Sequence, residues 1–352
     1  MEKKYKERLV GLDIYRVMSA LGIFIFHTRN MDSVNYGAFD IVIAMGAVFM
    51  TGFFVLSGFS LYYSYGDIDI ADSHQIKNFY KKRIFSIIPS YFFVSLLFIL
   101  VFKRGRDIVN ELILAPVELV GMQSWFDSLF KFSHNGGTWF ISCLLFAYFI
   151  FPLIVALIRD LNVKQIKRVT LIIMLLIMWA PIVTIVFDCS SIYSKPLFRM
   201  LEFIIGMLMC VLWNKSDKKR YSAVKLGCVL IISLLIQIIL TFKFSFPRDY
   251  MFYNVFFLPF FMIAVMIMAS LKIRENKVIS FMSKISYEFF LAQFFTWGIT
   301  DYIVKKLLIE NILLIVIISF LICFSIATLL HIIVRKIVNT LTHNGKFGIN
   351  IR

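Results

Sequence analysis

Two ionisable residues, Arg16 and His27, lie within the first apolar stretch of the sequence, where an uncompensated charge is costly. On an α-helix their spacing corresponds to about 16 Å of rise and an angular offset of roughly 20°, so both side chains leave the same face. A neutral imidazole can take a proton from a hydroxyl, whereas a guanidinium can only hold a phosphate or carbonyl oxygen. Each residue alone has a structural explanation, a histidine at a helix end and an arginine that reaches the interface. Their shared face instead favours a joint catalytic role.

Five further residues are candidates for binding. Lys82 and Arg83 belong to the basic segment KNFYKKRIFSIIPSYF at the predicted cytoplasmic start of a span. The positive-inside rule alone can explain the charge of this segment. An anionic, nucleotide-bearing thioester would, however, also meet the protein here. Arg199 and Glu202 are three residues apart and can pair, either as a structural ion pair or as the polar wall of a cavity. Trp139 follows a glycine pair and is either an aromatic-belt residue or a contact for a closely approaching substrate.

The composition excludes a water-soluble domain. Of 352 residues, 60% are hydrophobic and 17% aromatic, with a mean hydropathy of +0.83, which is more apolar surface than a globule of this size can bury. The 37 Lys and Arg residues outnumber 21 Asp and Glu, but they lie in short clusters between apolar runs, so no nucleic-acid partner is predicted. The cysteines have no metal-ligand spacing, and no metal is expected.

We therefore predict an all-α integral membrane protein with about ten transmembrane helices in a single domain spanning residues 1–352. The N-terminal segment is interpreted as the start of a retained helix, not as a signal peptide. A tight turn around Lys305, Lys306 and Glu310 separates the last two spans. The predicted spans are residues 11–29, 38–63, 85–102, 139–158, 169–187, 198–213, 224–242, 252–271, 285–304 and 308–334.

An even number of spans places both termini on one side of the membrane. The alternate connections and the two terminal segments carry 25 Lys and Arg residues, against 11 on the opposite side, with Arg16 left inside the first span. By the positive-inside rule both termini are predicted to be cytoplasmic. The longest outer connection, residues 103–138, contains Trp125, Phe126, Phe130 and Phe132, and we expect it to cap an outward-facing cavity.

Six segments in order along this scaffold resemble the acyltransferase family 3 of integral-membrane proteins. They are LDIYRVMSALGIFIFH with Arg16 and His27, FFVLSGFSL at 53–61, NFYKKRIFSIIPSY at 78–91, GTWFISCLLFAYFIFPLI at 137–154, FRMLEFIIGM at 198–207 and ISYEFFLAQ at 285–293.

The resemblance implies transfer of an acyl group, usually acetyl, from cytosolic acyl-CoA to a hydroxyl of a lipid-linked or cell-surface polysaccharide, in a bacterial cytoplasmic membrane. It implies that His27 is the base or transient acyl carrier and that Arg16 is its central partner. The sequence departs from the family pattern at Ser86, where a second arginine is common, and at Gln293, where histidine is common. It also has leucines at 144 and 145, where some subgroups carry a glutamate.

Two other functions stay open at this point. A transporter or flippase of a polysaccharide or lipid-linked sugar would also place Arg16 and His27 along its pathway, although no inverted repeat is evident. A scaffold without chemistry would not need both residues. The acyl group, the acceptor sugar, a covalent acyl-histidine intermediate and the oligomeric state, with a homodimer as one option, are not determined by the sequence.

Overall fold

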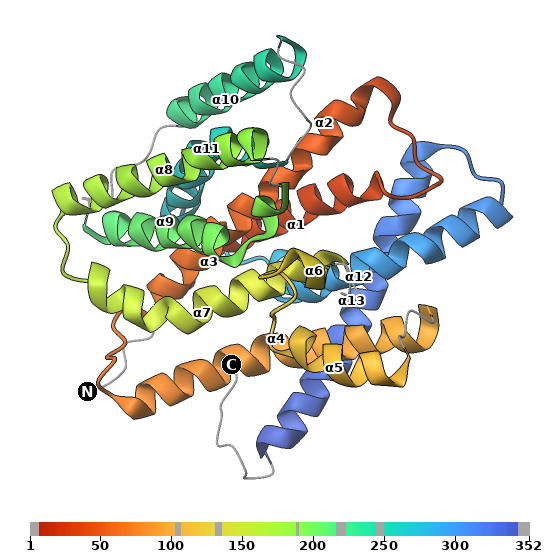
Figure 1. Ribbon diagram of the computed structural model, residues 1–352, viewed down its shortest axis with the longest axis horizontal. Coiled ribbons are helices and arrows are strands. Elements are labelled where there is room, and N and C mark those ends of the chain that lie inside the picture. Colours follow the sequence, from red (N-terminus) through yellow and green to blue (C-terminus); the bar gives the residue numbers. More distant parts are fainter. Residues whose placement is uncertain are drawn as a thin grey trace.

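The computed structural model describes residues 7–102, 107–130, 136–187, 190–215, 223–243 and 250–343, and within these residues every regular element is a helix (Figure 1). Each of the ten predicted spans overlaps one helical segment. The principal helices are α1 (Val10–Thr28), α2 (Asp40–Ala44), α3 (Phe49–Tyr65), α4 (Ser73–Phe102), α5 (Ile108–Leu119), α6 (Asp127–Phe130), α7 (Trp139–Ile158), α8 (Val163–Val186), α9 (Pro196–Lys215), α10 (Ala223–Lys243), α11 (Tyr250–Ser270), α12 (Lys277–Lys306) and α13 (Ile312–His343).

Among the described residues, seven helical segments are long and apolar enough to cross a membrane. They are α1, the continuous segment Gly37–Tyr65 that contains α2 and α3, α4, α7, α8, α9 and α13. The all-helical membrane fold is therefore confirmed, whereas the count of ten stays a prediction. α10 and α11 contain shorter apolar stretches, and α12 is interrupted by buried polar residues such as Glu288 and Gln293.

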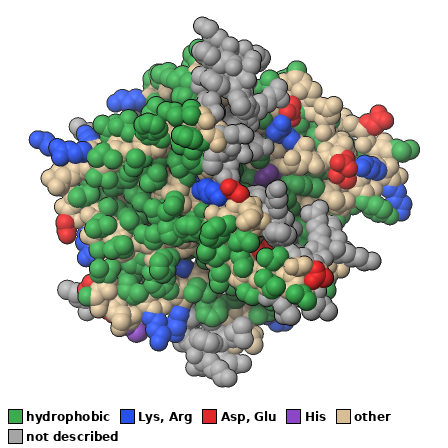
Figure 2. All heavy atoms as spheres, viewed as in Figure 1, with side chains coloured by type: hydrophobic (Ala, Val, Ile, Leu, Met, Phe, Trp, Pro, Cys, Tyr) green, Lys and Arg blue, Asp and Glu red, His purple; other side chains and the backbone are tan. Residues whose placement is uncertain are grey.

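The outer surface has the character expected of a protein that faces lipid. Hydrophobic side chains cover much of the face shown in Figure 2. On α8, Leu171, Leu175 and Trp179 are more than half exposed, as are Ile231 and Leu235 on α10. Apolar exposure on this scale is typical of a membrane or interaction surface.

The helix connections contact one another in two groups, as alternating spans require. Connections predicted to be cytoplasmic bond among themselves, and so do those predicted to be external. Which group faces the cytoplasm stays a prediction. In the group predicted to be cytoplasmic, Arg8 pairs with Glu275 at 2.6 Å and Lys215 donates to the Leu161 carbonyl at 2.6 Å. In the group predicted to be external, Lys195 pairs with Asp127 at 2.8 Å and the backbone N–H of Ser33 donates to Asp301 at 3.1 Å. Phe132 of the long connection lies outside the described residues. So do these cations of the charge count: Lys3, Lys4, Lys6, Lys103, Arg104, Arg106, Lys131, Lys218, Lys219, Arg220, Arg248, Lys346 and Arg352.

α3 and α9 pack closely together at two glycines, Gly58 and Gly206. A Cβ atom at Gly58 would lie 1.9 Å from the Phe203 carbonyl oxygen, and one at Gly206 would lie 2.0 Å from the Val55 carbonyl oxygen. Only residues without a side chain permit this separation, as in other membrane helix pairs packed through small residues. Two of the six family-like segments are thus the two sides of one helix interface.

The long outer connection is folded onto the helices. Gln123 donates to the Thr138 carbonyl at 3.2 Å, and Ser124 donates to the Ser194 carbonyl at 2.7 Å; both side chains are buried. Gly121 permits the turn between them and α5, because its φ of 72° lies in the left-handed region. The connection therefore packs against the segment between α8 and α9, and its Trp125 contacts Phe146 of α7 with 4.7 Å between the ring centroids.

Candidate active site

Arg16 is held at one end of α1 by a carboxylate and a hydroxyl. Its Nη1 donates to Ser283 Oγ at 3.2 Å and lies 3.8 Å from Asp13 Oδ1. Ser283 in turn donates to Asp13 at 2.6 Å, and Arg8 pairs with the other Asp13 oxygen at 2.9 Å. Arg8 is shared between Asp13 and Glu275, so the two arginines and the two carboxylates of this cluster balance in charge. The Arg16 guanidinium is one-third exposed and can still donate hydrogen bonds to a ligand.

Arg83 approaches the same region from α4. Its guanidinium stacks over Tyr65 and Tyr148, with 5.3 and 5.8 Å between the guanidinium carbon and the ring centroids. Arg16 interacts electrostatically with Tyr148, the ring that Arg83 contacts, and with Arg83 itself, so the two arginines lie in one region of the protein. Within the described residues Arg83 has no carboxylate partner and its buried Nε atom has no hydrogen bond. Lys82 lies partly exposed beside it. A guanidinium without a carboxylate partner, such as that of Arg83 within the described residues, is suited to binding a phosphate or carbonyl oxygen.

His27 lies near the other end of α1 and contacts one face of α12. Its Nδ1 lies 2.6 Å from Gln293 Oε1, and its ring packs against Phe290, Phe294 and Trp297 with centroid separations of 5.1 to 6.1 Å. Since an amide oxygen only accepts, Nδ1 carries the proton in this arrangement, and Nε2 is left with the lone pair. A neutral imidazole oriented in this way can act as a general base.

Trp139, Arg199 and Glu202 are brought together in a third, buried cluster. Arg199 Nη1 lies 2.8 Å from Glu202 Oε2, and the two side chains are 0% and 1% exposed. Thr51 donates to Glu202 at 2.8 Å, and the Arg199 guanidinium lies 4.2 Å from the Tyr193 ring centroid and 5.3 Å from that of Trp139. The cluster has the closed hydrogen bonding of a structural ion pair; contact with a substrate stays a prediction.

Aromatic rings separate this cluster from His27. Phe54 lies 5.6 Å from the Arg199 guanidinium and 5.3 Å from the Phe140 ring, and Phe140 lies 5.2 Å from Phe290, which contacts His27. The structure therefore brings Arg16 and Arg83 together, and Trp139, Arg199 and Glu202 together, but not the two groups with each other.

Three residues that hold the candidate site are not predicted from the sequence. Asp13 and Ser283 orient Arg16, and Gln293 orients His27. Asp13 has a usable signal, because an acidic residue inside a span and three residues from an arginine is a natural partner. Gln293 stands out in the sequence only as a departure from the family pattern, although it is fully buried. The other departure, Ser86, uses its hydroxyl within its own helix, donating to the Arg83 carbonyl at 2.8 Å.

Comparison with known proteins identifies the family. The model of an acyltransferase domain, that of acyltransferase family 3, matches residues 9–331, from α1 to α13. The chain belongs to this family. This acyltransferase-3 protein is also similar to the acyltransferase MdmB of Streptomyces mycarofaciens, with 25% identity over 230 residues. That match covers 58% of the chain and only 57% of the relative's length. No solved structure matches the chain.

Proposed function

We propose that this protein is a membrane O-acyltransferase of the bacterial cytoplasmic membrane, which moves an acyl group, usually acetyl, from cytosolic acyl-CoA to a hydroxyl of a cell-surface or lipid-linked polysaccharide. The observation that carries the proposal is the pair formed by Arg16 and His27 on one face of α1. At one end of that face Arg16 lies in the same region as Arg83, which has no carboxylate partner among the described residues. At the other end Gln293 orients the His27 imidazole. Family membership supports the same reaction class.

The donor binds at the arginine end. Lys82 and Arg83 bind the phosphates of acyl-CoA, because Arg83 has no carboxylate partner in the described structure and lies on an aromatic support. Arg16, fixed by Asp13 and Ser283, holds a carbonyl oxygen of the donor's arm. The donor's arm then runs along α1 from Arg16 toward His27, a separation of about 16 Å, and places the thioester carbonyl next to His27.

The reaction at His27 is an acyl transfer with one proton relay. The acceptor hydroxyl gives its proton to His27 Nε2 while its oxygen attacks the thioester carbonyl carbon. The C–S bond breaks, the imidazolium returns the proton to the thiolate, and the products are the ester and free CoA. Gln293 accepts from Nδ1–H throughout, which keeps the base in one tautomer and stabilises the imidazolium. In a covalent variant Nε2 carries the acyl group before the hydroxyl receives it, with the same overall balance.

The buried cluster supports the outer side of this site. Trp139, Arg199 and Glu202 hold the wall formed by Phe140 and Phe290, behind the His27 ring. A direct contact between this cluster and the acceptor sugar would require the wall to open.

The test measures release of CoA thiol from acetyl-CoA by purified protein in nanodiscs, with and without bacterial cell-envelope polysaccharide. Loss of a general base lowers the rate by about 10² to 10⁴-fold, and we expect this of His27→Ala. His74→Ala, which alters an exposed histidine of α4, is the matched control. Arg83→Ala is expected to raise the KM for acetyl-CoA more than it lowers kcat.

Two results would contradict the proposal. Full activity of a folded His27→Ala variant would refute the assignment of the base. Absence of acceptor-dependent CoA release with every acyl-CoA offered would instead favour transport of an undecorated sugar.

A further inference from the structure

Two N–H groups beside His27 have no acceptor among the described residues. They are Nε2 of Gln293 and Nε1 of Trp297, and both atoms are buried. The two residues lie on adjacent turns of α12, about 40° apart around the helix, and so face the same side. Buried polar groups are nearly always hydrogen-bonded, and a buried indole N–H usually has a partner. Two unpaired donors at one place therefore indicate a site that a ligand completes.

Trp297 contacts the proposed base directly. Its ring centroid lies 5.6 Å from that of His27 and 4.4 Å from that of Phe294. The residue as a whole is only partly buried. Trp297 thus presents a hydrogen-bond donor and an apolar ring next to the residue that would activate the acceptor hydroxyl. A sugar ring has the complementary groups, since its oxygens accept hydrogen bonds and its C–H faces pack against aromatic rings.

The segment that follows α1, residues 29–36, covers this place and is named here the α1 loop. Met31 of this loop is 2% exposed and belongs to a small hydrophobic cluster against which Trp297 packs. Asp301, one turn beyond Trp297 on α12, accepts a hydrogen bond from the backbone N–H of Ser33 at 3.1 Å. Because Nε1 of Trp297 is buried under these contacts, a ligand that bonds to it must displace part of the α1 loop.

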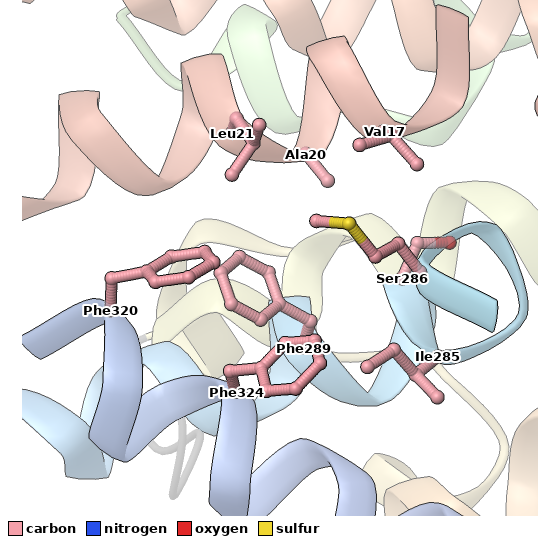
Figure 3. Close-up of a pocket in the computed structure, with 9 residues that line it drawn as sticks. Val17, Ala20, Leu21, Ile285, Ser286, Phe289, Phe320 and Phe324 are labelled. Atoms are coloured by element: carbon pink, nitrogen blue, oxygen red, sulfur yellow. The ribbon is translucent and has the colours of Figure 1, made fainter. Parts of the chain in front are cut away.

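The pocket between α1, α12 and α13 offers no comparable site (Figure 3). Apolar side chains such as Ala20, Phe289 and Phe324 line it. Among the described residues of its lining, the polar side chain is Ser286, whose hydroxyl donates to the Ser283 carbonyl at 2.8 Å. This lining suits apolar groups, whereas the unpaired donors beside His27 suit a ligand with many oxygen atoms.

We infer that Trp297 binds a sugar ring of the acceptor, with Nε1–H donating to a sugar oxygen and the indole ring packed against the sugar. The inference rests on the proposed function, because it concerns the acceptor of the same reaction. A sugar bound in this way places a neighbouring hydroxyl at His27. It reaches the site when the α1 loop moves away from Trp297.

The test compares Trp297→Phe and Trp297→Leu with wild-type protein in nanodiscs. Acetyl-CoA is the donor, bacterial cell-envelope polysaccharide is the acceptor, and release of CoA thiol is measured. Phenylalanine keeps an aromatic ring but removes the N–H. Loss of this one hydrogen bond is expected to raise the half-saturating polysaccharide concentration about 2- to 10-fold. Leucine also removes the aromatic ring and should raise that concentration further.

Two controls show whether the effect is confined to the acceptor. The Kd of acetyl-CoA, measured by calorimetry without polysaccharide, should be the same in both variants as in wild type. Trp179→Leu makes the same change at a tryptophan of α8 that is 59% exposed, and should alter neither quantity. If Trp297→Leu does not fold, the conservative Trp297→Phe variant still decides the result.

A cross-link tests the access route independently. Ser33 and Asp301 are hydrogen-bonded in the structure, so the double variant Ser33→Cys/Asp301→Cys can form a disulfide under an added oxidant. We expect the oxidised protein to lose polysaccharide-dependent CoA release, to keep binding acetyl-CoA, and to regain release after reduction with dithiothreitol. The two single variants, treated with the same oxidant, control for loss of the native hydrogen bond.

The outcomes separate this inference from the proposed function. An unchanged half-saturating polysaccharide concentration in both Trp297 variants would overturn the inference and leave the transferase intact. An equal loss of acetyl-CoA affinity would also overturn it, because Trp297 would then support the fold and not the acceptor. Full activity of the cross-linked protein would refute entry under the α1 loop. Absence of polysaccharide-dependent CoA release by wild-type protein would overturn both proposals.

Discussion

Replacement of Gln293 by leucine tests whether the His27 base depends on its hydrogen-bond partner. The substitution keeps the approximate volume but removes the oxygen that lies 2.6 Å from Nδ1. His27 then loses the contact that fixes its tautomer, and a buried N–H is left without an acceptor. The loss of such a contact costs about 1 to 3 kcal/mol. If that loss falls on the transition state, kcat/KM declines roughly 5- to 150-fold.

The assay compares kcat/KM for acyl transfer in Gln293→Leu, Gln293→Glu and a control. Glutamate keeps an acceptor oxygen at the same position, so Gln293→Glu is expected to retain clearly more activity than Gln293→Leu. Gln237→Leu makes the same change at a buried glutamine of α10 and reports any general loss of stability. Equal activity of Gln293→Leu and wild type, in a preparation where His27→Ala is inactive, would refute the orienting role.

Two further predictions concern the scaffold. Arg199→Met leaves the Glu202 carboxylate buried without its cation and is expected to destabilise the protein by about 3 to 5 kcal/mol. The double variant Arg199→Met/Glu202→Leu is expected to recover much of this loss, because it also removes the carboxylate. Thermal unfolding in detergent measures both variants, and equal Tm values for the single and the double variant would contradict the pairing argument. Gly58→Leu places a side chain where the Phe203 carbonyl lies, since the new Cβ would stand 1.9 Å from that oxygen. The variant is expected to lose the monodisperse folded peak in size-exclusion chromatography, whereas the control Ser64→Leu, on the exposed part of α3, should keep this peak. A folded Gly58→Leu variant would show that α3 and α9 can separate.

The sequence was sufficient for features that depend on local pattern. Apolar length located the helices, and helical periodicity placed Arg16 and His27 on one face, because both are properties of one segment. The i,i+3 spacing likewise predicted that Arg199 and Glu202 can pair, and they do, at 2.8 Å. That Trp139 stacks beside this pair depends on how α7 packs against α9, which no local pattern reports.

The partners of the reactive residues could not be predicted, because they come from distant parts of the chain. Gln293 meets His27 across 266 positions, and Ser283 meets Arg16 across 267. These two contacts have nearly the same separation for a physical reason. α1 and α12 pack side by side over much of their length, so polar residues at matching heights on the two helices meet in order.

The polar residues of α12 also explain why the hydropathy pattern predicts a membrane span least clearly in this part of the sequence. A lipid-exposed helix with Ser283, Glu288 and Gln293 would leave polar groups in hydrocarbon, at a cost of several kcal/mol. In the structure each of these side chains is buried and bonded, Ser283 to Asp13, Glu288 to Ser90 at 3.0 Å, and Gln293 to His27. The polarity of Ser283 and Gln293 therefore fixes the register of α12 against α1, and Glu288 ties α12 to α4. If this reasoning holds, the packing that stabilises α12 in the membrane is the same packing that orients both reactive side chains, so a variant that disturbs the α1–α12 register should lose activity and stability together.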